Sequence, residues 1–257
     1  MKAVILAGGF GTRISEESAV RPKPMVEIGG MPIIWHIMKI YAAHGIVDFV
    51  ICAGYKGFLL KEYFASYFLH RSDVTFDLAA NSMTTHSSAV EPWRVTVVDT
   101  GMDTMTGGRI LLAREHIGEE TFCLTYGDCV AALDVKALVD FHRRERATVT
   151  LTAIQPPGRF GALSLEPGGD RIDRFHEKPD GDGGWVNGGF FVVEPDVFGH
   201  IADEQTIWER EPLERLAEEG KLAAYRHTGY WQNMDSLRDK MVLEEQWASG
   251  SPGWKIW

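Results

Sequence analysis

The sequence predicts an α/β protein in which a mixed, mostly parallel sheet is flanked by helices and the second half is richer in strands. Up to about residue 146, short apolar runs alternate with segments whose apolar residues recur every three or four positions, as in buried strands and amphipathic helices. Such alternation builds a parallel sheet with helices on both faces. After residue 147 strand-like runs predominate. The sequence shows no repeat and no linker, so we expect one domain, residues 1–257, with halves at about 1–146 and 147–257.

Each expected element follows from its local pattern. In the first half we expect strands at residues 2–7, 47–53 and 121–126, and helices at residues 32–44, 58–68 and 135–146. In the second half we expect strands at residues 147–154, 162–165, 171–177 and 186–193, and helices at residues 209–219 and 236–247. Pro32 suits a first helical turn, Gly45 a helix end, and Asp134 an N-cap. Two prolines exclude a helix at residues 21–24.

Residues 73–98 differ from their surroundings, because they carry short mixed runs and few helix signals. A β-rich excursion, a loop and a contact between subunits all fit this stretch. The aromatic-rich stretch at residues 63–70 is a second candidate for such a contact.

Charge and composition exclude several classes of partner. Thirty-six acidic against twenty-six basic residues give a net charge of −10, and such a field repels nucleic acid and anionic membranes. No apolar run reaches the ~18–20 residues that cross a bilayer, and the first apolar run is shorter than the ~7 residues of a signal peptide core. We therefore expect a cytoplasmic protein with small-molecule partners. The three cysteines lack metal-ligand spacing, which indicates reduced core thiols.

A glycine-rich loop follows the first strand, reading Gly-Gly-Phe-Gly-Thr-Arg at residues 8–13. Glycines allow the backbone N–H groups to approach phosphate closely. A dinucleotide fingerprint would need glycine where Ile14 stands, and a Walker loop would need a GK[ST] ending that does not occur. Arg13 and Lys23, the latter held between two prolines, suit a reaction dominated by charge on phosphoryl oxygens. The alternative is a surface turn with solvated cations.

Four further positions carry candidate polar chemistry. Asp128 follows a strand and a glycine, at the strand end where ligands bind in open α/β sheets. Asp235 precedes a helix, so it is either a metal ligand or a helix cap. Glu177 and Lys178 form a Glu-Lys-Pro triplet, which alone also suits a charged surface turn. The histidines form no metal-binding pattern such as HExxH.

These motifs together resemble the sugar-1-phosphate nucleotidyltransferase family. The resemblance rests on the strand followed by GGxGTR, the PKP at residues 22–24, the Tyr-Gly-Asp at residues 126–128, the Glu-Lys-Pro at 177–179, the Asn-Gly-Gly at 187–189 and residues 231–235. It covers the whole chain. It implies a Rossmann-like fold of the nucleotide-diphospho-sugar transferase type, with a nucleotide-binding first half and a sugar-phosphate-binding second half. Stretches such as MTGGR and PPGRFGAL resemble the cytidylyltransferase branch.

The resemblance also implies roles for individual residues. The expected catalytic residues are Arg13, Lys23 and Asp128, and the expected magnesium ligands are Asp128 and Asp235. Expected nucleotide contacts are Leu6, Ala7, Gly8, Gly9, Gly11, Thr12, Arg13, Lys23, Thr104, Arg109 and Gly127. Expected sugar-phosphate contacts are Glu177, Lys178, Asn187 and Gly188. The implied cofactor is Mg²⁺, the implied substrates are CTP and glucose 1-phosphate, and the implied assembly is a homo-oligomer.

Three alternatives stay open at this point. UTP or dTTP, or a different sugar 1-phosphate, would fit the same motifs. A non-catalytic nucleotide-sugar-binding regulator is expected to lose a metal carboxylate or the lysine, and this chain retains both. The chain departs from the family pattern at Cys129, where the family usually has glycine. If that position needs a positive φ, cysteine is strained there; otherwise the thiol narrows the pocket or changes the sugar accepted.

Overall fold

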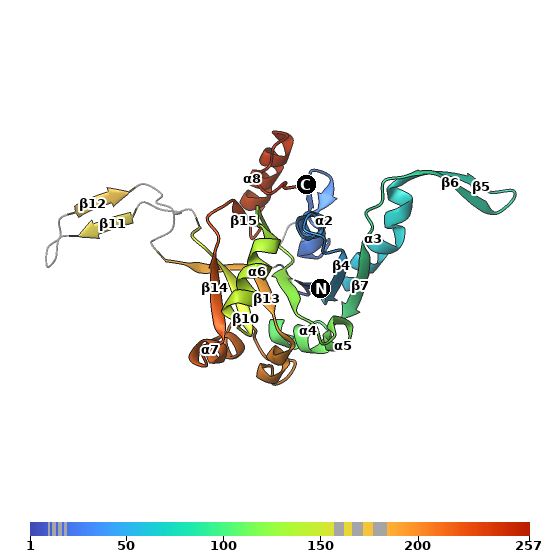
Figure 1. The fold of residues 1–257 in the computed structure, drawn as a ribbon. Helices are drawn as coiled ribbons and strands as arrows, with labels where there is room; N and C mark the ends of the chain where they lie inside the picture. Colours follow the sequence, from blue (N-terminus) through green and yellow to red (C-terminus); the bar gives the residue numbers. More distant parts are fainter. Residues whose placement is uncertain are drawn as a thin grey trace.

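The computed structural model describes residues 1–9, 11, 14, 17, 20–156, 162–165, 172–176 and 184–257. A seven-stranded mixed sheet forms the centre, in the order β14–β10–β13–β8–β1–β4–β7 (Figure 1). Only β13 runs antiparallel to its neighbours, β10 and β8, whereas the other pairs are parallel. The predicted fold class is therefore confirmed. Strands from both halves of the chain share this one sheet.

The strand and helix bounds agree with the predictions within a few residues for the longer elements. The sheet strands are β1 Ala3–Ala7, β4 Asp48–Ala53, β7 Arg94–Asp99, β8 Phe122–Tyr126, β10 Val149–Ile154, β13 Val186–Val193 and β14 Leu222–Arg226. The helices are α2 Ile33–Ala42, α3 Gly57–His70, α4 Thr106–Leu112, α5 Arg114–Ile117, α6 Val135–Glu145, α7 Glu211–Glu218 and α8 Leu237–Ala248, with 3-10 turns η2 Lys23–Met25 and η3 Pro195–His200. Asp134 caps α6 through Ala137 N–H at 2.9 Å, as predicted.

Two apolar clusters explain why β1 is buried along its whole length. Ala3, Ile5 and Ala7 pack into a cluster with α2, α6 and α8, whereas Val4 and Leu6 pack into one with α4, η3 and α7. A strand covered on both faces is expected to read as a continuous apolar run, which is the pattern of residues 3–7. Within the described part of the chain, no helix is long and apolar enough to span a bilayer. The three cysteines are buried and free, as predicted.

Several elements were not predicted, among them α4, α5 and β14 and four very short strands. The pair β9 Cys129–Ala131 and β15 Trp231–Asn233, and the pair β2 Glu27–Ile28 and β3 Met31–Pro32, are too short to leave a period in the sequence. The prolines at 22 and 24 do not exclude every turn of helix. Pro24 is tolerated near the start of η2, where a backbone N–H has no helical partner to lose. The helix predicted at residues 209–219 begins two residues later, at Glu211.

Two hairpins extend from opposite sides of the body in Figure 1. β5 Ser72–Asp77 pairs with β6 Ser82–Ser88, and β11 Ala162–Leu165 pairs with β12 Ile172–His176. The first of these hairpins matches the β-rich alternative among those left open for residues 73–98, although the end of that stretch belongs to β7 of the central sheet. Every residue of β6 is exposed, so this hairpin packs little of its own surface against the chain.

The C-terminal segment closes over the start of α2 through aromatic rings. Trp254 is fully buried and stacks on Trp247 with ring centroids 6.2 Å apart. His36, also fully buried, donates from Nε2 to the Ile28 carbonyl at 2.9 Å, and its Nδ1 faces the Trp254 indole N–H at 3.4 Å. Both partners suit the neutral imidazole. Burial, only partly offset by bonds to the Ile28 and Met31 carbonyls, lowers the pKa of His36 to about 4.

His36 is predicted to make stability depend on pH between about 6.5 and 4. The unfolded chain binds this proton near pH 6.5 and the folded chain only near 4, so the unfolded state gains protons first as pH falls. Stability is therefore full above the unfolded pKa, and roughly 3 kcal/mol is lost once pH has passed below the folded one. Urea unfolding of wild type and His36→Gln between pH 7 and 4 measures this. An equally steep pH dependence in both proteins would exclude His36 as the cause.

Candidate functional site

The candidate site lies where β1 and β8 end side by side at the same edge of the sheet. Gly8 and Gly9 follow β1, and Gly127 and Asp128 follow β8, with Gly127 N–H bonded to the Leu6 carbonyl at 2.9 Å. A cavity of about 910 Å³ opens here, within the size range of small-molecule sites. Its lining includes every predicted site residue that the structure describes: Leu6, Ala7, Gly8, Gly9, Gly11, Lys23, Thr104, Arg109, Gly127, Asp128, Asn187, Gly188 and Asp235.

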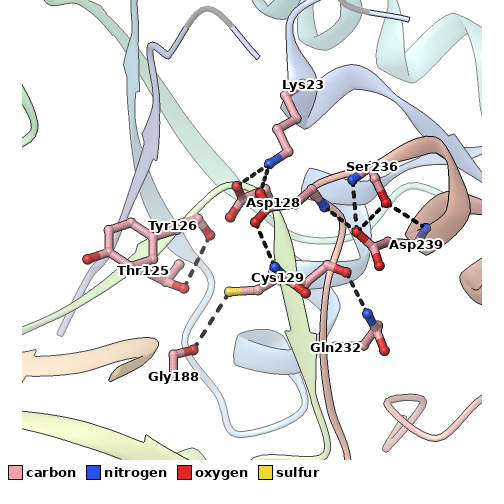
Figure 2. Close-up of polar contacts among 11 residues, drawn as sticks. Lys23, Thr125, Tyr126, Asp128, Cys129, Gly188, Gln232, Ser236 and Asp239 are labelled. Atoms are coloured by element: carbon pink, nitrogen blue, oxygen red, sulfur yellow. Dashed lines mark hydrogen bonds and ion pairs between the residues drawn. The ribbon is translucent and has the colours of Figure 1, made fainter. Parts of the chain in front are cut away.

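Lys23 joins the two predicted metal carboxylates. Its Nζ lies 2.7 Å from Oδ2 of Asp128 and 2.6 Å from Oδ1 of Asp235. Figure 2 shows Lys23 reaching down to Asp128 from its own loop. η2 sets the base of this side chain, and Pro24 beside it is buried. Burial lowers the pKa of Lys23, but the attraction and hydrogen bonds of both aspartates outweigh it, so the pKa lies above its usual value. Lys23 is therefore a fixed cation.

Short-strand pairing brings Asp235 to Asp128 across more than one hundred residues of chain. Cys129 pairs with Asn233 where β9 meets β15, and Met234 N–H donates to the Asp128 carbonyl at 2.8 Å. Asn233 also donates to Oδ2 of Asp235 at 2.8 Å. The N-cap of α8 is Ser236, which shares a capping box with Asp239 (Figure 2). The alternative reading of Asp235 as that cap is thus excluded, and its carboxylate faces the cavity.

The two aspartates offer a divalent cation an oxygen donor set that fits magnesium. Among the described residues, no group of three or more histidine, cysteine, aspartate or glutamate side chains is arranged to hold a metal. One oxygen of each aspartate nevertheless converges on a single cation, the Lys23 ammonium. Magnesium commonly takes one or two carboxylates and completes its shell with water and substrate phosphates. A metal here would therefore depend on a phosphorylated ligand.

Arg109 also lines the cavity and is buried in a cradle of glycines and carbonyls. Its Nη1 donates to Thr100 Oγ1 and the Gly101 carbonyl at 2.7 Å each, and its Nη2 donates to the carbonyls of Gly8 at 3.1 Å and Met102 at 3.2 Å. Burial lowers the pKa of Arg109, although a guanidinium keeps its charge in proteins. Arg109 thus ties the glycine loop to the segment 100–102.

Asn187 and Gly188, the predicted sugar contacts, lie at the start of β13. Asn187 Oδ1 accepts from Gly189 N–H at 2.9 Å, and the Trp231 indole donates to the Gly188 carbonyl at 2.7 Å. Both bonds fix the path of the backbone along the cavity wall. Trp231 and Tyr126 also line the cavity. We did not single out either side chain as functional, although each stands in a motif that carried the resemblance.

Cys129 is accommodated without backbone strain. In the described chain, the non-glycine residues with positive φ are Lys56, Asn81 and Arg146, so the first alternative for Cys129 is wrong. Its thiol instead lies against the Asn-Gly-Gly segment and faces the Gly188 carbonyl at 3.9 Å (Figure 2). A Cβ on Gly189 would lie 3.2 Å from the sulfur. Burial and the neighbouring Asp128 raise the pKa of Cys129, so the thiol stays protonated and is a poor nucleophile.

Four of the predicted site residues, Thr12, Arg13, Glu177 and Lys178, lie outside the described residues. The structure does not test their assigned roles.

Comparison with known proteins identifies the family. The family model for nucleotidyl transferases matches residues 2–239. The chain belongs to the nucleotidyl transferase family. Over the full length of both chains it is 58% identical to glucose-1-phosphate cytidylyltransferase of Salmonella typhi. It is 43% identical, again over both full lengths, to a probable glucose-1-phosphate cytidylyltransferase of Bacillus subtilis.

Several solved structures share the fold. A UDP-glucose pyrophosphorylase complexed with UDP-glucose superposes with a TM-score of 0.69 at 18% identity, covering 97% of this chain and 98% of that one. HddC from Yersinia pseudotuberculosis gives a TM-score of 0.69 at 21% identity, covering 96% and 99%. At these identities the likeness concerns the fold alone.

Gly8 and Gly9 are predicted to differ in their tolerance of a methyl group. A Cβ on Gly8 would lie 2.1 Å from Nη1 of Arg109, whereas a Cβ on Gly9 would meet nothing within 4 Å. Neither glycine has a positive φ. Gly8→Ala must displace a guanidinium with several acceptors, so we expect a loss of about 1–3 kcal/mol. Gly9→Ala should stay within about 0.5 kcal/mol of wild type. Urea unfolding measures the free energy of unfolding of both variants, and equal losses would contradict the close packing of Arg109 against Gly8.

Proposed function

We propose that this chain transfers a cytidylyl group from CTP to α-D-glucose 1-phosphate, forming CDP-glucose and releasing pyrophosphate. The observation that carries the proposal is the 58% identity, over the full length of both chains, to a glucose-1-phosphate cytidylyltransferase. The cavity supports it independently, because two carboxylates and a fixed ammonium converge at the edge of the sheet where ligands of α/β folds bind.

The nucleotide is proposed to lie along the β1 end of the cavity. The backbone of residues 6–9 would face the base, with Gly11, Thr12 and Arg13 at the phosphates. Thr104 and Gly127 are the further proposed contacts. Arg109 can donate to O2 and N3 of cytosine, whereas uracil and thymine carry a proton on N3. Buried hydrogen-bond mismatch of this kind discriminates strongly. Because carbonyls and Thr100 already hold the Arg109 guanidinium, base binding requires it to exchange some of these partners.

Asp128 and Asp235 are proposed to hold Mg²⁺, and Lys23 to neutralise phosphoryl oxygens beside it. When bound, the ion supplies positive charge to the triphosphate. Lys23 lies in contact with both carboxylates, so it is within reach of a phosphate placed at them. At the other end, Asn187 and Gly188 are proposed to bind the sugar. Glu177 and Lys178 are proposed to bind the sugar hydroxyls and the sugar phosphate.

The proposed chemistry is a direct in-line displacement. A phosphate oxygen of glucose 1-phosphate attacks the α-phosphorus of CTP, and the bond to the bridging oxygen breaks as pyrophosphate leaves. A phosphate dianion is already nucleophilic, so no general base is required, and the buried Cys129 thiol is not used. Positioning and charge neutralisation then provide the rate enhancement.

The test is pyrophosphate release from glucose 1-phosphate and magnesium, with CTP, UTP, dTTP, ATP and GTP assayed in parallel. Release with CTP alone supports the proposal. Release with another triphosphate contradicts the assignment of the base but retains the reaction. Silence with all five while CTP still binds would point to a different sugar phosphate or to a non-catalytic regulator.

Asp128→Asn and Asp235→Asn are predicted to lower kcat by roughly 10²–10³, the effect of about 3–4 kcal/mol of lost electrostatic stabilisation. Each change keeps the shape of the side chain and removes its charge. Steady-state assays of pyrophosphate release over a magnesium titration measure this decrease in kcat. Asp134→Asn, at the cap of α6 outside the cavity, is the matched control. Near-normal turnover of Asp128→Asn in magnesium would refute the metal assignment.

We also propose that copies of this chain associate through the hairpin β5–β6. Two-stranded hairpins are marginally stable alone, yet this one exposes 56% of Phe76, 91% of Leu78 and 48% of Met83. It extends away from the body (Figure 1). Large apolar side chains gathered on one protruding element mark association surfaces.

Replacing Phe76 and Leu78 together by serine is predicted to shift the molecular mass in light scattering toward that of one chain, because it removes apolar surface from the contact. Met241→Ser, on α8 and 56% exposed in the structure, serves as the control and should leave the mass unchanged. A monomeric wild type, or an unaltered mass in the hairpin variant, would refute this role of the hairpin.

A further inference from the structure

A carboxylate with no assigned role, Glu209, stands at the rim of the cavity. Its Oε1 accepts from the Tyr126 hydroxyl at 2.6 Å, and its Oε2 accepts from the Thr106 hydroxyl at 2.7 Å. Tyr126 is the last residue of β8, whereas Thr106 is the first residue of α4. Glu209 therefore links two walls of the cavity.

Other hydrogen bonds, besides those of Glu209, hold the segment 203–210 in place. Met105 N–H donates to the Glu204 carbonyl and Gly107 N–H to the Thr206 carbonyl, both at 2.9 Å. A Cβ on Gly108 would lie 2.2 Å from the Glu204 carbonyl oxygen, so the backbone of this segment occupies the space of a side chain. The glycines of the MTGGR motif at residues 105–109 thus have a physical reason.

Trp208 completes the anchoring on the other side. It is fully buried in the cluster with α4, η3 and α7, and its backbone N–H donates to the Thr106 hydroxyl at 2.9 Å. The residue preceding Glu209 is therefore immobilised. The position of the Glu209 carboxylate follows from this backbone rather than from a flexible loop.

The direction of hydrogen bonding continues from Glu209 to Asn187. An ionised carboxylate only accepts, so the Tyr126 hydroxyl must donate its proton to Glu209 and keeps its lone pairs for Asn187. Asn187 Nδ2 then donates to that hydroxyl at 3.2 Å, and Oδ1 accepts from Gly189 N–H at 2.9 Å. The hydrogen-bonded series Glu209–Tyr126–Asn187 therefore allows only one orientation of the Asn187 side-chain amide.

We propose that Glu209 is a positioning residue that determines sugar recognition by holding the Tyr126 hydroxyl and, through it, the Asn187 amide. This inference rests on the proposed function, in which Asn187 contacts the sugar. An amide fixed in one orientation presents its remaining donor and acceptor capacity in fixed places, so it distinguishes sugars whose hydroxyls differ in configuration. These hydrogen bonds are exposed to solvent in the structure, and a bound sugar would cover them, so a mismatched hydroxyl would then leave a donor or acceptor unpaired at a cost in binding.

Glu209→Gln provides the test, because glutamine is nearly isosteric but can donate as well as accept, which frees Tyr126 and Asn187 to reverse. We expect the KM for glucose 1-phosphate to rise about ten-fold, the effect of one lost hydrogen bond, with the KM for CTP changed less than about two-fold. Turnover of galactose 1-phosphate relative to glucose 1-phosphate should increase. Glu211→Gln, exposed two residues away, is the matched control.

Tyr126→Phe removes the hydroxyl that joins Glu209 to Asn187, so it should raise the KM for glucose 1-phosphate as Glu209→Gln does. Because both changes break one hydrogen-bonded unit, the double variant should be no worse than the poorer single variant. Thermal unfolding verifies that each protein folds. Additive losses, an equal rise in the KM for CTP, or unchanged sugar selectivity in Glu209→Gln would overturn the positioning role.

An inactive wild type would refute the proposed function without deciding the role of Glu209. Calorimetric titration of the full chain with glucose 1-phosphate then decides it. Binding that weakens about ten-fold in Glu209→Gln supports the positioning role. Equal binding in the two proteins, or no binding by wild type, overturns it.

Discussion

The candidate site depends on the contact of one ammonium with two carboxylates. Lys23, Asp128 and Asp235 are brought together by three separate parts of the chain, and each is held by a different local device. Pro24 stiffens the turn that bears the lysine, β8 ends at the first aspartate, and the β9–β15 pair places the second. Without the cation, two carboxylates this close would repel one another. Lys23 therefore balances the negative charge of the two aspartates, a pair of carboxylates that would also suit a divalent cation carrying a phosphate.

Two further side chains connect the cavity walls in a comparable way. Arg109 ties the loop after β1 to the segment after β7 by donating to carbonyl oxygens. Glu209 ties α4 to β8 by accepting from hydroxyls. A guanidinium can only donate hydrogen bonds and an ionised carboxylate can only accept them, so the direction of each hydrogen bond is unambiguous in both places. The ends of the cavity are thereby shaped by charge-assisted bonds rather than by loop length.

The small residues around the cavity have two different explanations. Gly8 is required because the Arg109 guanidinium lies against it, and Gly108 because the backbone of Glu204 does. A Cβ on Gly9 would meet nothing within 4 Å, so the lack of a side chain there leaves space that a ligand can occupy. The glycine-rich loop that first indicated phosphate binding is thus partly a packing feature of the protein itself.

The sequence by itself determined the fold class, the long strands and helices and the family. Buried strands read as continuous apolar runs, and helices such as α6 carry their own cap, so these signals are local. It also placed Lys23, Asp128, Asp235 and Asn187 among the candidates through their motifs. It did not determine that Lys23 joins the two aspartates, that Ser236 rather than Asp235 caps α8, or that Cys129 is unstrained. Tyr126 and Glu209 escaped notice for the same reason. The Ser236 cap is the exception, because its capping box with Asp239 is a local Ser-x-x-Asp pattern. The other features depend on partners dozens to hundreds of residues away, which only the tertiary structure brings into contact.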